Sequence, residues 1–341
     1  MTMVTESKSR FKLGAPALVL SVTVLIVGCS SPSSPNPDST RPIVVSAADF
    51  DLPIVGDGAS KLPTVVKSAD DVEVKVTDTS RIIVLNEAIA EIVISLGFID
   101  KIIGRDATTT IESLTAIPKV SSGHDISAES ILELKPTLVI GDTRSGPPEA
   151  IQQLRGAGVP IVLAPEVWKL SDIQPRIDLI SAALGAREFG KKLTDRTESD
   201  IDEALSTLDG TAVRPRVAFV YVRGTASVFL LGGKESGADE MIRSAGGVDV
   251  GTDLGLAAFT PLTSEAIVNA NPDIIVVTTR GLASVGGLTG LLDLPGVTQT
   301  PAAKNNAVVS IDDDLLLSFG PRTGELIVRM AKAFKMLATK N

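Results

Sequence analysis

Apolar residues fall into short continuous runs that alternate with segments of helical spacing over most of the chain. Residues 82–85 form one such run, residues 87–96 carry the helical pattern, and Gly97 follows as a C-terminal cap. A short run that is apolar throughout is typical of a strand covered on both faces of a parallel sheet. Strands and helices that alternate in this way predict an α/β fold.

One helix–strand unit occurs twice, at residues 127–140 and again at residues 263–276. Each copy begins with a hydroxyl residue placed as a helix N-cap, and a glutamate follows in the first turn, Glu129 in one copy and Glu265 in the other. A proline then separates the helix from an apolar run. Two copies predict two similar lobes, and a cleft between paired lobes can bury a small ligand.

The remaining pattern extends both lobes and joins them. Residues 171–208 contain no convincing strand, and residues 186–208 read as one long helix with apolar positions amid many charges. We therefore expect two Rossmann-like α/β lobes joined by one long helix, which permits rocking and resists wide opening. Further strands are expected near Ile102, near Lys119 and at 160–163, 216–222, 228–231 and 307–311, with helices at 148–155 and 319–337.

The N-terminus has the features of a lipoprotein signal peptide. Basic residues precede an apolar run at 13–27, which ends at Gly28 and Cys29. A small residue before cysteine suits a peptidase that leaves Cys29 as a lipidated N-terminus. The alternative is a membrane anchor, but the run is shorter than the ~20 residues that a spanning helix needs. The serine- and proline-rich residues that follow suit a tether.

These patterns predict five segments, and the composition limits what they do. They are a signal peptide (1–28), a lipidated tether with an irregular extension that holds a strand or two (29–76), an N-terminal lobe (77–170), linking helices (171–210) and a C-terminal lobe (211–341). Cys29 is the single cysteine, so a disulfide framework and a cysteine metal cluster are excluded. Cleavage leaves 29 basic and 40 acidic residues, which disfavours nucleic acid as a partner.

The single histidine, His124, lies directly before the first repeated helix. That loop is expected at the carboxyl end of a strand, where open α/β sheets bind ligands. The repeat offset places Thr260, beside Phe259, at the corresponding position of the second lobe. The two loops can then face each other across the cleft. A solvated or merely packed histidine is the alternative.

The single tyrosine, Tyr221, closes the first strand of the second lobe together with Arg223. Residues two apart share one side of a strand, so the guanidinium can reach the phenol. A neighbouring cation favours a phenolate, which is a good ligand for ferric iron. The alternative is a core tyrosine with an arginine that points to solvent.

His124 and Tyr221 together can supply the two axial ligands of a haem iron, since both residue types are established haem ligands. A bare zinc or manganese site would draw on several histidines or many carboxylates. The sequence contains no Gly-x-Ser-x-Gly elbow, no phosphate loop and no dinucleotide fingerprint after the first strand.

The lipobox, residues 81–85, the turn at 104–109, the repeats and the long helix resemble the substrate-binding lipoproteins of ABC importers for haem, siderophores and cobalamin. Gly123-His124-Asp125 with Tyr221-Val222-Arg223 most resembles the haemin-binding lipoproteins of Gram-positive haem importers. The resemblance implies a periplasmic-binding-protein-like fold with a helical backbone. It also implies that His124 and Tyr221 bind the iron of a transported haem b, with Arg223 hydrogen-bonded to the tyrosine.

The resemblance further implies that Glu129 and Glu265 dock on arginines of an ABC permease, which works with its ATPase. Helix capping alone is the alternative role of these glutamates. Phe259, Thr260, Arg105 and Arg144 are candidate pocket residues. The expected protein is a non-enzymatic monomer anchored through Cys29 on the extracytoplasmic face of the membrane.

Three alternatives stay open at this point. A ferric-siderophore or cobalamin receptor belongs to the same importer class. A haem-dependent enzyme needs an open iron position, which two protein ligands do not leave. An adhesive or scaffolding lipoprotein would bind no small ligand.

Overall fold

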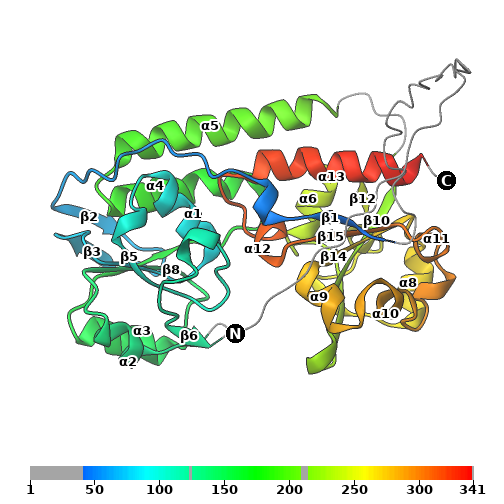
Figure 1. The fold of residues 1–341 in the computed structure, drawn as a ribbon, viewed down its shortest axis with the longest axis horizontal. Helices are drawn as coiled ribbons and strands as arrows, with labels where there is room; N and C mark the ends of the chain where they lie inside the picture. Colours follow the sequence, from blue (N-terminus) through cyan, green and yellow to red (C-terminus); the bar gives the residue numbers. More distant parts are fainter. Residues whose placement is uncertain (1–40, 123–124, 209–213, 340–341) are drawn as a thin grey trace, which may run out of the picture. The chain divides into compact units, whose positions relative to one another are not determined.

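Two β-sheets, each covered by helices, account for most of the described chain (Figure 1). The computed structural model describes residues 41–122, 125–208 and 214–339. The signal peptide, Cys29 and His124 lie outside the described residues.

The sheet of the N-terminal lobe has four parallel strands in the order β5-β4-β8-β9. These are β4 (Ile82–Val84), β5 (Ile102–Arg105), β8 (Leu138–Asp142) and β9 (Ile161–Ala164), and the helices on them are α1 (Glu87–Ser95), α2 (Ala128–Glu133) and α3 (Pro148–Gly156). The strand expected near Lys119 is a single bridge to Arg105. A short antiparallel pair, β6 (Ser121–Ser122) and β7 (Asp125–Ile126), precedes α2.

The sheet of the C-terminal lobe follows the order β1-β15-β14-β10-β11-β13, with β12 beside β10. Its strands are β1 (Ile43–Val45), β10 (Arg216–Arg223), β11 (Val228–Gly232), β12 (Val248–Asp249), β13 (Phe259–Pro261), β14 (Ile274–Thr278) and β15 (Val308–Ile311). Its helices are α6 (Ala238–Ser244), α7 (Val250–Asp253), α8 (Ser264–Ala270), α9 (Thr279–Ser284), α10 (Gly287–Leu292), α11 (Pro301–Lys304) and α12 (Asp313–Leu316). β11 pairs antiparallel with β10 and β13, whereas the other pairs are parallel.

The sequence repeat is confirmed as a structural repeat. Ser127 Oγ accepts from the backbone N–H of Ser130 at 3.2 Å at the start of α2, and Thr263 Oγ1 accepts from Ala266 at 3.1 Å at the start of α8. After each helix the residue before the proline has a positive φ, and a fully buried strand follows, β8 or β14. The same local caps and stops therefore build the same unit in both lobes.

Three helices on one side of the sheets connect the lobes. They are α4 (Ile173–Ala183), α5 (Arg187–Ser206) and α13 (Thr323–Ala338). Figure 1 shows α5 extending along α4 and α13. One continuous apolar core contains side chains from these helices and from both sheets, while two smaller cores lie on the opposite face of each sheet. The predicted fold class, two α/β lobes with a helical connection, is confirmed.

The chain before β4 also bridges the lobes, and we call residues 41–76 the strap. Its first strand, β1, pairs with β15 of the C-terminal lobe. The strap then contacts the N-terminal lobe, where Gly58 N–H donates to Leu96 O at 3.1 Å, and ends in the hairpin of β2 (Thr64–Lys67) and β3 (Glu73–Val76). Gly97, at a φ of +88°, lies so close to the strap that a Cβ would be 2.4 Å from Gly58 N. The strap is therefore a second connection between the lobes. The boundaries of the five segments expected from the sequence stay a prediction.

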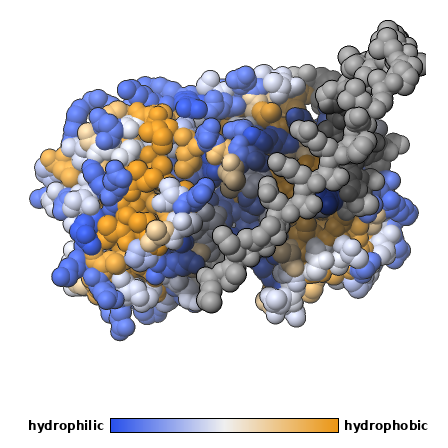
Figure 2. Space-filling view, viewed as in Figure 1, coloured by the Kyte–Doolittle hydropathy of each residue, from blue (hydrophilic) through white to orange (hydrophobic). Residues whose placement is uncertain are grey.

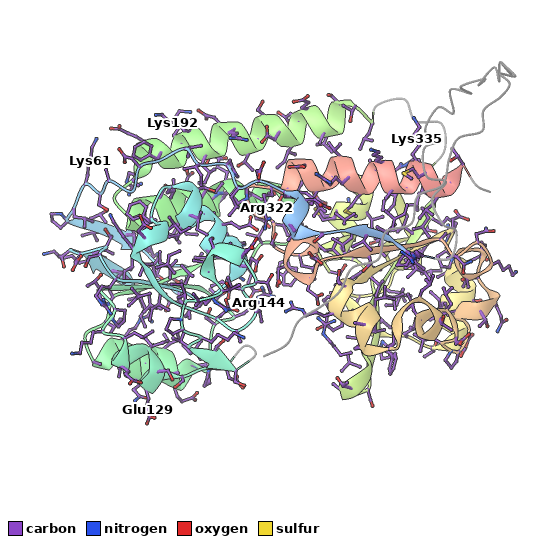
Figure 3. All side chains as sticks on the ribbon, in the orientation of Figure 1. Lys61, Glu129, Arg144, Lys192, Arg322 and Lys335 are labelled. Carbon is purple, nitrogen blue, oxygen red and sulfur yellow. The ribbon has the colours of Figure 1, made fainter. Side chains whose placement is uncertain are left out.

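A buried cluster of charges lies where the lobes meet. Arg322, just before α13, donates to Glu91 Oε1 of α1 from Nε at 3.2 Å and stands 3.8 Å from Glu87 Oε1. Figure 3 places Arg322 at this junction, and Figure 2 shows hydrophilic residues gathered there beside apolar areas of each lobe. Burial, with a smaller effect of the Asp314 charge, raises the pKa of Glu87 to about 9. Arg322 thus pairs with Glu91, and burial favours the protonated form of Glu87.

Among the residues that the structure describes, no helix is both long enough and apolar enough to cross a membrane.

Truncation of the shared core should destabilise the whole protein. Phe334 of α13 is 2% exposed in that core, so Phe334→Ala should lower the free energy of unfolding by about 3–5 kcal/mol in urea denaturation. Met336 on the same helix is 38% exposed, and Met336→Ala should change it by less than about 0.5 kcal/mol. Equal losses in the two variants would contradict this account of the core.

The raised pKa of Glu87 predicts a pH-dependent loss of stability. Between its ordinary pKa of 4.5 and about 9, the unfolded chain releases the proton and the folded chain keeps it, so stability falls as pH rises. Glu87→Gln removes this titration. Its unfolding free energy relative to the native protein should rise by more than about 1.4 kcal/mol between pH 5 and pH 8. Glu133→Gln, at an exposed position of α2, serves as the control and should show no such rise. A pH-independent difference at Glu87 would refute the assignment.

Candidate functional site

A cavity of about 390 Å³ lies between the lobes, within the ~300–1,000 Å³ range of small-molecule sites. The N-terminal lobe and the segment after it contribute Asn86, Glu87, Ala88, Thr108, Arg144 and Trp168. The C-terminal lobe contributes Tyr221, Arg223, Leu230, Phe259, Thr278, Arg280, Asp313, Asp314, Leu317 and Ser318. The lining thus combines aromatic and apolar surface with cations on both walls.

Aromatic rings form the wall of the C-terminal lobe. The rings of Tyr221 and Phe259 are 5.9 Å apart at 66°, and Phe219 stands edge-on to both. The register of β10, β11 and β13 brings Phe259 to the face that carries Tyr221. Side chains alternate along a strand, so Thr260 points to the opposite face and is not among the lining residues. Phe259 is 37% exposed and leaves apolar ring surface free in the cavity.

Arg223 lies against the face of the Tyr221 ring. The guanidinium carbon is 4.5 Å from the ring centroid, which is a cation–π contact. Nη1 donates to Val222 O at 2.9 Å and to Thr278 Oγ1 at 3.1 Å, and Nη2 donates to Asp313 Oδ1 at 2.5 Å. The sequence analysis expected Arg223 to be hydrogen-bonded to Tyr221, whereas the structure places the guanidinium over the ring and directs its hydrogen bonds to Val222, Thr278 and Asp313.

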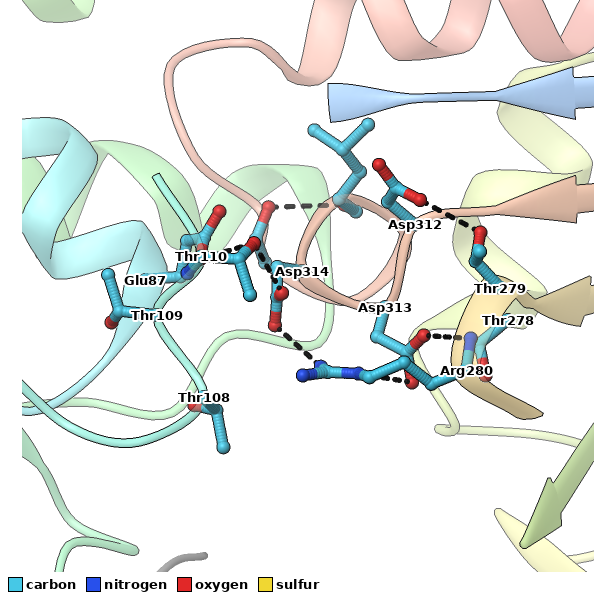
Figure 4. A network of polar contacts seen from close by, with 12 residues as sticks. Glu87, Thr108, Thr109, Thr110, Thr278, Thr279, Arg280, Asp312, Asp313 and Asp314 are labelled. Atoms are coloured by element: carbon cyan, nitrogen blue, oxygen red, sulfur yellow. Dashed lines mark hydrogen bonds and ion pairs between the residues drawn. The ribbon is translucent and has the colours of Figure 1, made fainter. Parts of the chain in front are cut away.

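Arg280 and two aspartates continue this polar array, as Figure 4 shows. The Arg280 backbone N–H donates to Asp313 Oδ2 at 2.9 Å, and its Nη2 donates to Asp314 Oδ1 at 3.1 Å. Asp314 Oδ2 accepts from Thr110 Oγ1 of the N-terminal lobe at 2.9 Å. Burial raises the pKa of Asp314 to about 6, against the opposing effect of Arg280.

The wall of the N-terminal lobe carries Arg144 beside Trp168. The Arg144 guanidinium carbon is 5.2 Å from the indole centroid, and its Nη2 is 3.4 Å from Asp142 Oδ2. Figure 3 shows Arg144 on the side of this lobe that faces the other lobe. The Arg144 side chain is 47% exposed, so its charge is available to an anionic group in the cavity.

His124 lies outside the described residues, and the strands on either side of it are β6 and β7. Ser122 and Asp125, on either side of residues 123–124, pair across β6 and β7. Ser121 and Ile126 of these strands line a small polar cavity together with Arg144, which also lines the cleft. β6 and β7 therefore lie beside the wall of the N-terminal lobe.

Two other sets of predicted residues lie away from the cleft. Arg105 is buried, and its guanidinium donates to the backbone carbonyls of Leu114 at 2.8 Å and Thr109 at 2.7 Å, so it has a structural role and is not among the lining residues. Glu129 and Glu265 are exposed in the first turns of α2 and α8. Figure 3 shows Glu129 on the side of its lobe away from α5.

The sequence did not single out Asn86, Asp313 or Asp314 as cleft residues. One signal for the aspartates was present, because three consecutive aspartates follow a buried parallel strand, β15, at its carboxyl end.

Comparisons with known proteins agree with this architecture. The solved haem-binding protein RhuT from Roseiflexus sp. RS-1 matches with a TM-score of 0.74 and 38% identity, over 76% of this chain and 100% of RhuT. The ABC transporter substrate-binding lipoprotein YvrC of Bacillus subtilis is 25% identical over 94% of this chain and 96% of its own length. The vitamin B12-binding protein of Vibrio parahaemolyticus is 24% identical over 76% of this chain and 91% of its own length.

The family model for periplasmic binding proteins matches residues 82–315, which include both sheets apart from β1. Because the match spans well over half of the chain, the protein belongs to the periplasmic binding protein family.

Proposed function

We propose that this protein is a receptor that binds haem b in the cleft between its lobes and delivers it to an ABC permease for uptake. The observation that carries the proposal is Tyr221, the single tyrosine, exposed to the cavity with Arg223 over its ring. Phenol oxygen is an established haem ligand, and the apolar rings beside it suit a flat porphyrin. The likeness to the haem-binding protein RhuT supports the same ligand.

The iron is held from both walls in this proposal. Tyr221 supplies an oxygen from the C-terminal lobe, and His124 supplies a nitrogen from the loop between β6 and β7. Two protein ligands leave no open position on the iron for a substrate. The protein therefore transports haem and does not act as an enzyme on it.

Cations on the two walls suit the carboxylates of haem. Arg144 on one wall and Arg280 on the other both line the cavity, and their side chains are 47% and 48% exposed. Arginine binds carboxylates through paired hydrogen bonds. We assign Arg144 the larger role, because one aspartate, Asp142, contacts it at 3.4 Å, whereas Asp313 and Asp314 both engage Arg280.

The receptor is anchored at Cys29 on the extracytoplasmic face of the membrane and acts as a monomer. YvrC, a relative over nearly its whole length, is named a substrate-binding lipoprotein of an ABC transporter, which supports this location. Glu129 and Glu265 stand exposed at equivalent positions of the two lobes, so each lobe presents one carboxylate to arginines of the permease.

A cobalamin receptor is the second candidate, because a vitamin B12-binding protein is among the relatives. The two functions differ in their need for an axial tyrosine. Parallel titrations with haemin and with cobalamin, followed by intrinsic fluorescence of the single tryptophan Trp168, separate them.

Haemin added to the purified protein should give a Soret band that depends on both axial ligands. Tyr221→Phe keeps the ring but removes the oxygen, and His124→Ala removes the nitrogen, so each should shift the band in absorption spectra. Phe259→Leu, which removes a ring but no ligand atom, should leave its position unchanged. A band that neither ligand variant alters would overturn the assignment.

Haem delivery should depend on the exposed glutamates, although haem binding should not. The double variant Glu129→Gln/Glu265→Gln should retain the native Soret titration and deliver haem at least about tenfold more slowly to the reconstituted transporter. Glu133→Gln on α2 is the matched control and should deliver haem at the native rate. Native delivery by the double variant would show that the glutamates only cap their helices.

A further inference from the structure

Asp313 and Asp314 are neighbours in α12 that hold different parts of the cleft. Asp313 binds Arg223 and Arg280 of its own lobe, whereas Asp314 binds Arg280 and, across the cleft, Thr110. Only Asp313 of this pair touches the arginine that lies over Tyr221. Figure 4 shows the contacts of Asp313 and Asp314 with Arg280, and of Asp314 with Thr110, around α12.

Asp313 and Arg223 form a short ion pair with a buried carboxylate. The Asp313 side chain is 6% exposed, and its Oδ1 lies 2.5 Å from Arg223 Nη2. Arg223 is the nearer of the two cations that Asp313 contacts, since Arg280 Nε is 3.4 Å from the same oxygen, and a buried carboxylate is stabilised by such pairing. Thr278 Oγ1, 3.1 Å from Nη1, is the second side-chain anchor of the same guanidinium.

The position of the guanidinium matters once Tyr221 binds iron. Coordination through the phenol places negative charge on the oxygen and the ring, and a cation over the ring face stabilises that charge. A free arginine side chain has high rotamer entropy and would spend much of its time elsewhere. A guanidinium that Asp313 already fixes stabilises the iron–oxygen bond without a further loss of rotamer entropy when haem binds.

We propose that Asp313 is a positioning residue for haem binding: it fixes the Arg223 guanidinium against the Tyr221 ring and so stabilises the bond between the phenol oxygen and iron. The inference rests on the proposed function. It assigns Asp313 no contact with haem, and its effect passes through Arg223.

The test uses the full-length protein loaded with haemin. Asp313→Asn should weaken the tyrosine-to-iron charge-transfer absorption and release haem to apomyoglobin about tenfold faster, as expected for the loss of one charge-assisted hydrogen bond. Asp312→Asn is the matched control. Asp312 neighbours Asp313 but bonds the strap at Ala47 N and Thr279, so this variant should keep the native absorption and release rate.

A double-variant cycle separates positioning from general loosening of the site. In the background of Arg223→Gln, Asp313→Asn should add less than a twofold change in release rate, because its effect passes through the missing guanidinium. A full tenfold change in that background would overturn the inference. If Asp313→Asn does not fold, as judged by circular dichroism, Thr278→Val tests the same anchor and should speed release about threefold; a native rate and spectrum would then overturn it.

Failure of this inference and failure of the proposed function give different results. If Tyr221→Phe abolishes the charge-transfer absorption but Asp313→Asn keeps it and the native release rate, only the role of Asp313 is refuted. If Tyr221→Phe leaves the absorption unchanged, the ligand assignment is refuted and the role of Asp313 with it.

Discussion

The apolar core that the two lobes share is the constraint on which the rest of the structure depends. Side chains of α4, α5 and α13 pack with those of both sheets into one continuous cluster, and the strap joins the lobes a second time. Separate cores would leave the lobes free to turn, whereas a close-packed common core resists it. The walls of the cleft are therefore brought opposite each other by packing far from the ligand site.

A common core also forces charges to be buried where the lobes meet. The ion pair of Arg322 and Glu91 joins the two lobes, and burial raises the pKa of Glu87 beside it. Buried charges are tolerated when they are paired and hydrogen-bonded. The same rule applies at the edge of the cleft, where Asp313 and Arg223 neutralise each other beside the aromatic wall. Buried ion pairs at the junction of the lobes thus accompany the apolar packing of the shared core.

The cleft concentrates side chains that are scarce in the rest of the chain. Aromatic residues make up 3% of the sequence, yet Tyr221, Phe259 and Trp168 all line one cavity. Because the chain has so few aromatic rings, a flat aromatic surface forms only where the fold brings several of them together. Arginines line the same cavity, and among them Arg144 is 47% exposed, so it offers a cation to a ligand. This combination suits an anionic ligand with flat apolar faces, which is the chemistry of a porphyrin with carboxylates.

The sequence by itself determined the parts of the protein that depend on neighbouring residues. Helix caps, proline stops and continuous apolar runs act within a few residues, so the repeated units and the linking helices were predictable. α13 begins at Thr323, later than periodicity suggested, because Phe319 has a φ of +49° and Pro321 follows. Only the tertiary structure decided which distant residues meet. Ala47 of the strap bonds Asp312, 265 residues away in the sequence, and Arg322 bonds Glu91, 231 residues away. Arg105 donates to backbone carbonyls and does not line the cleft. Such contacts depend on how whole layers pack, and no local pattern encodes them.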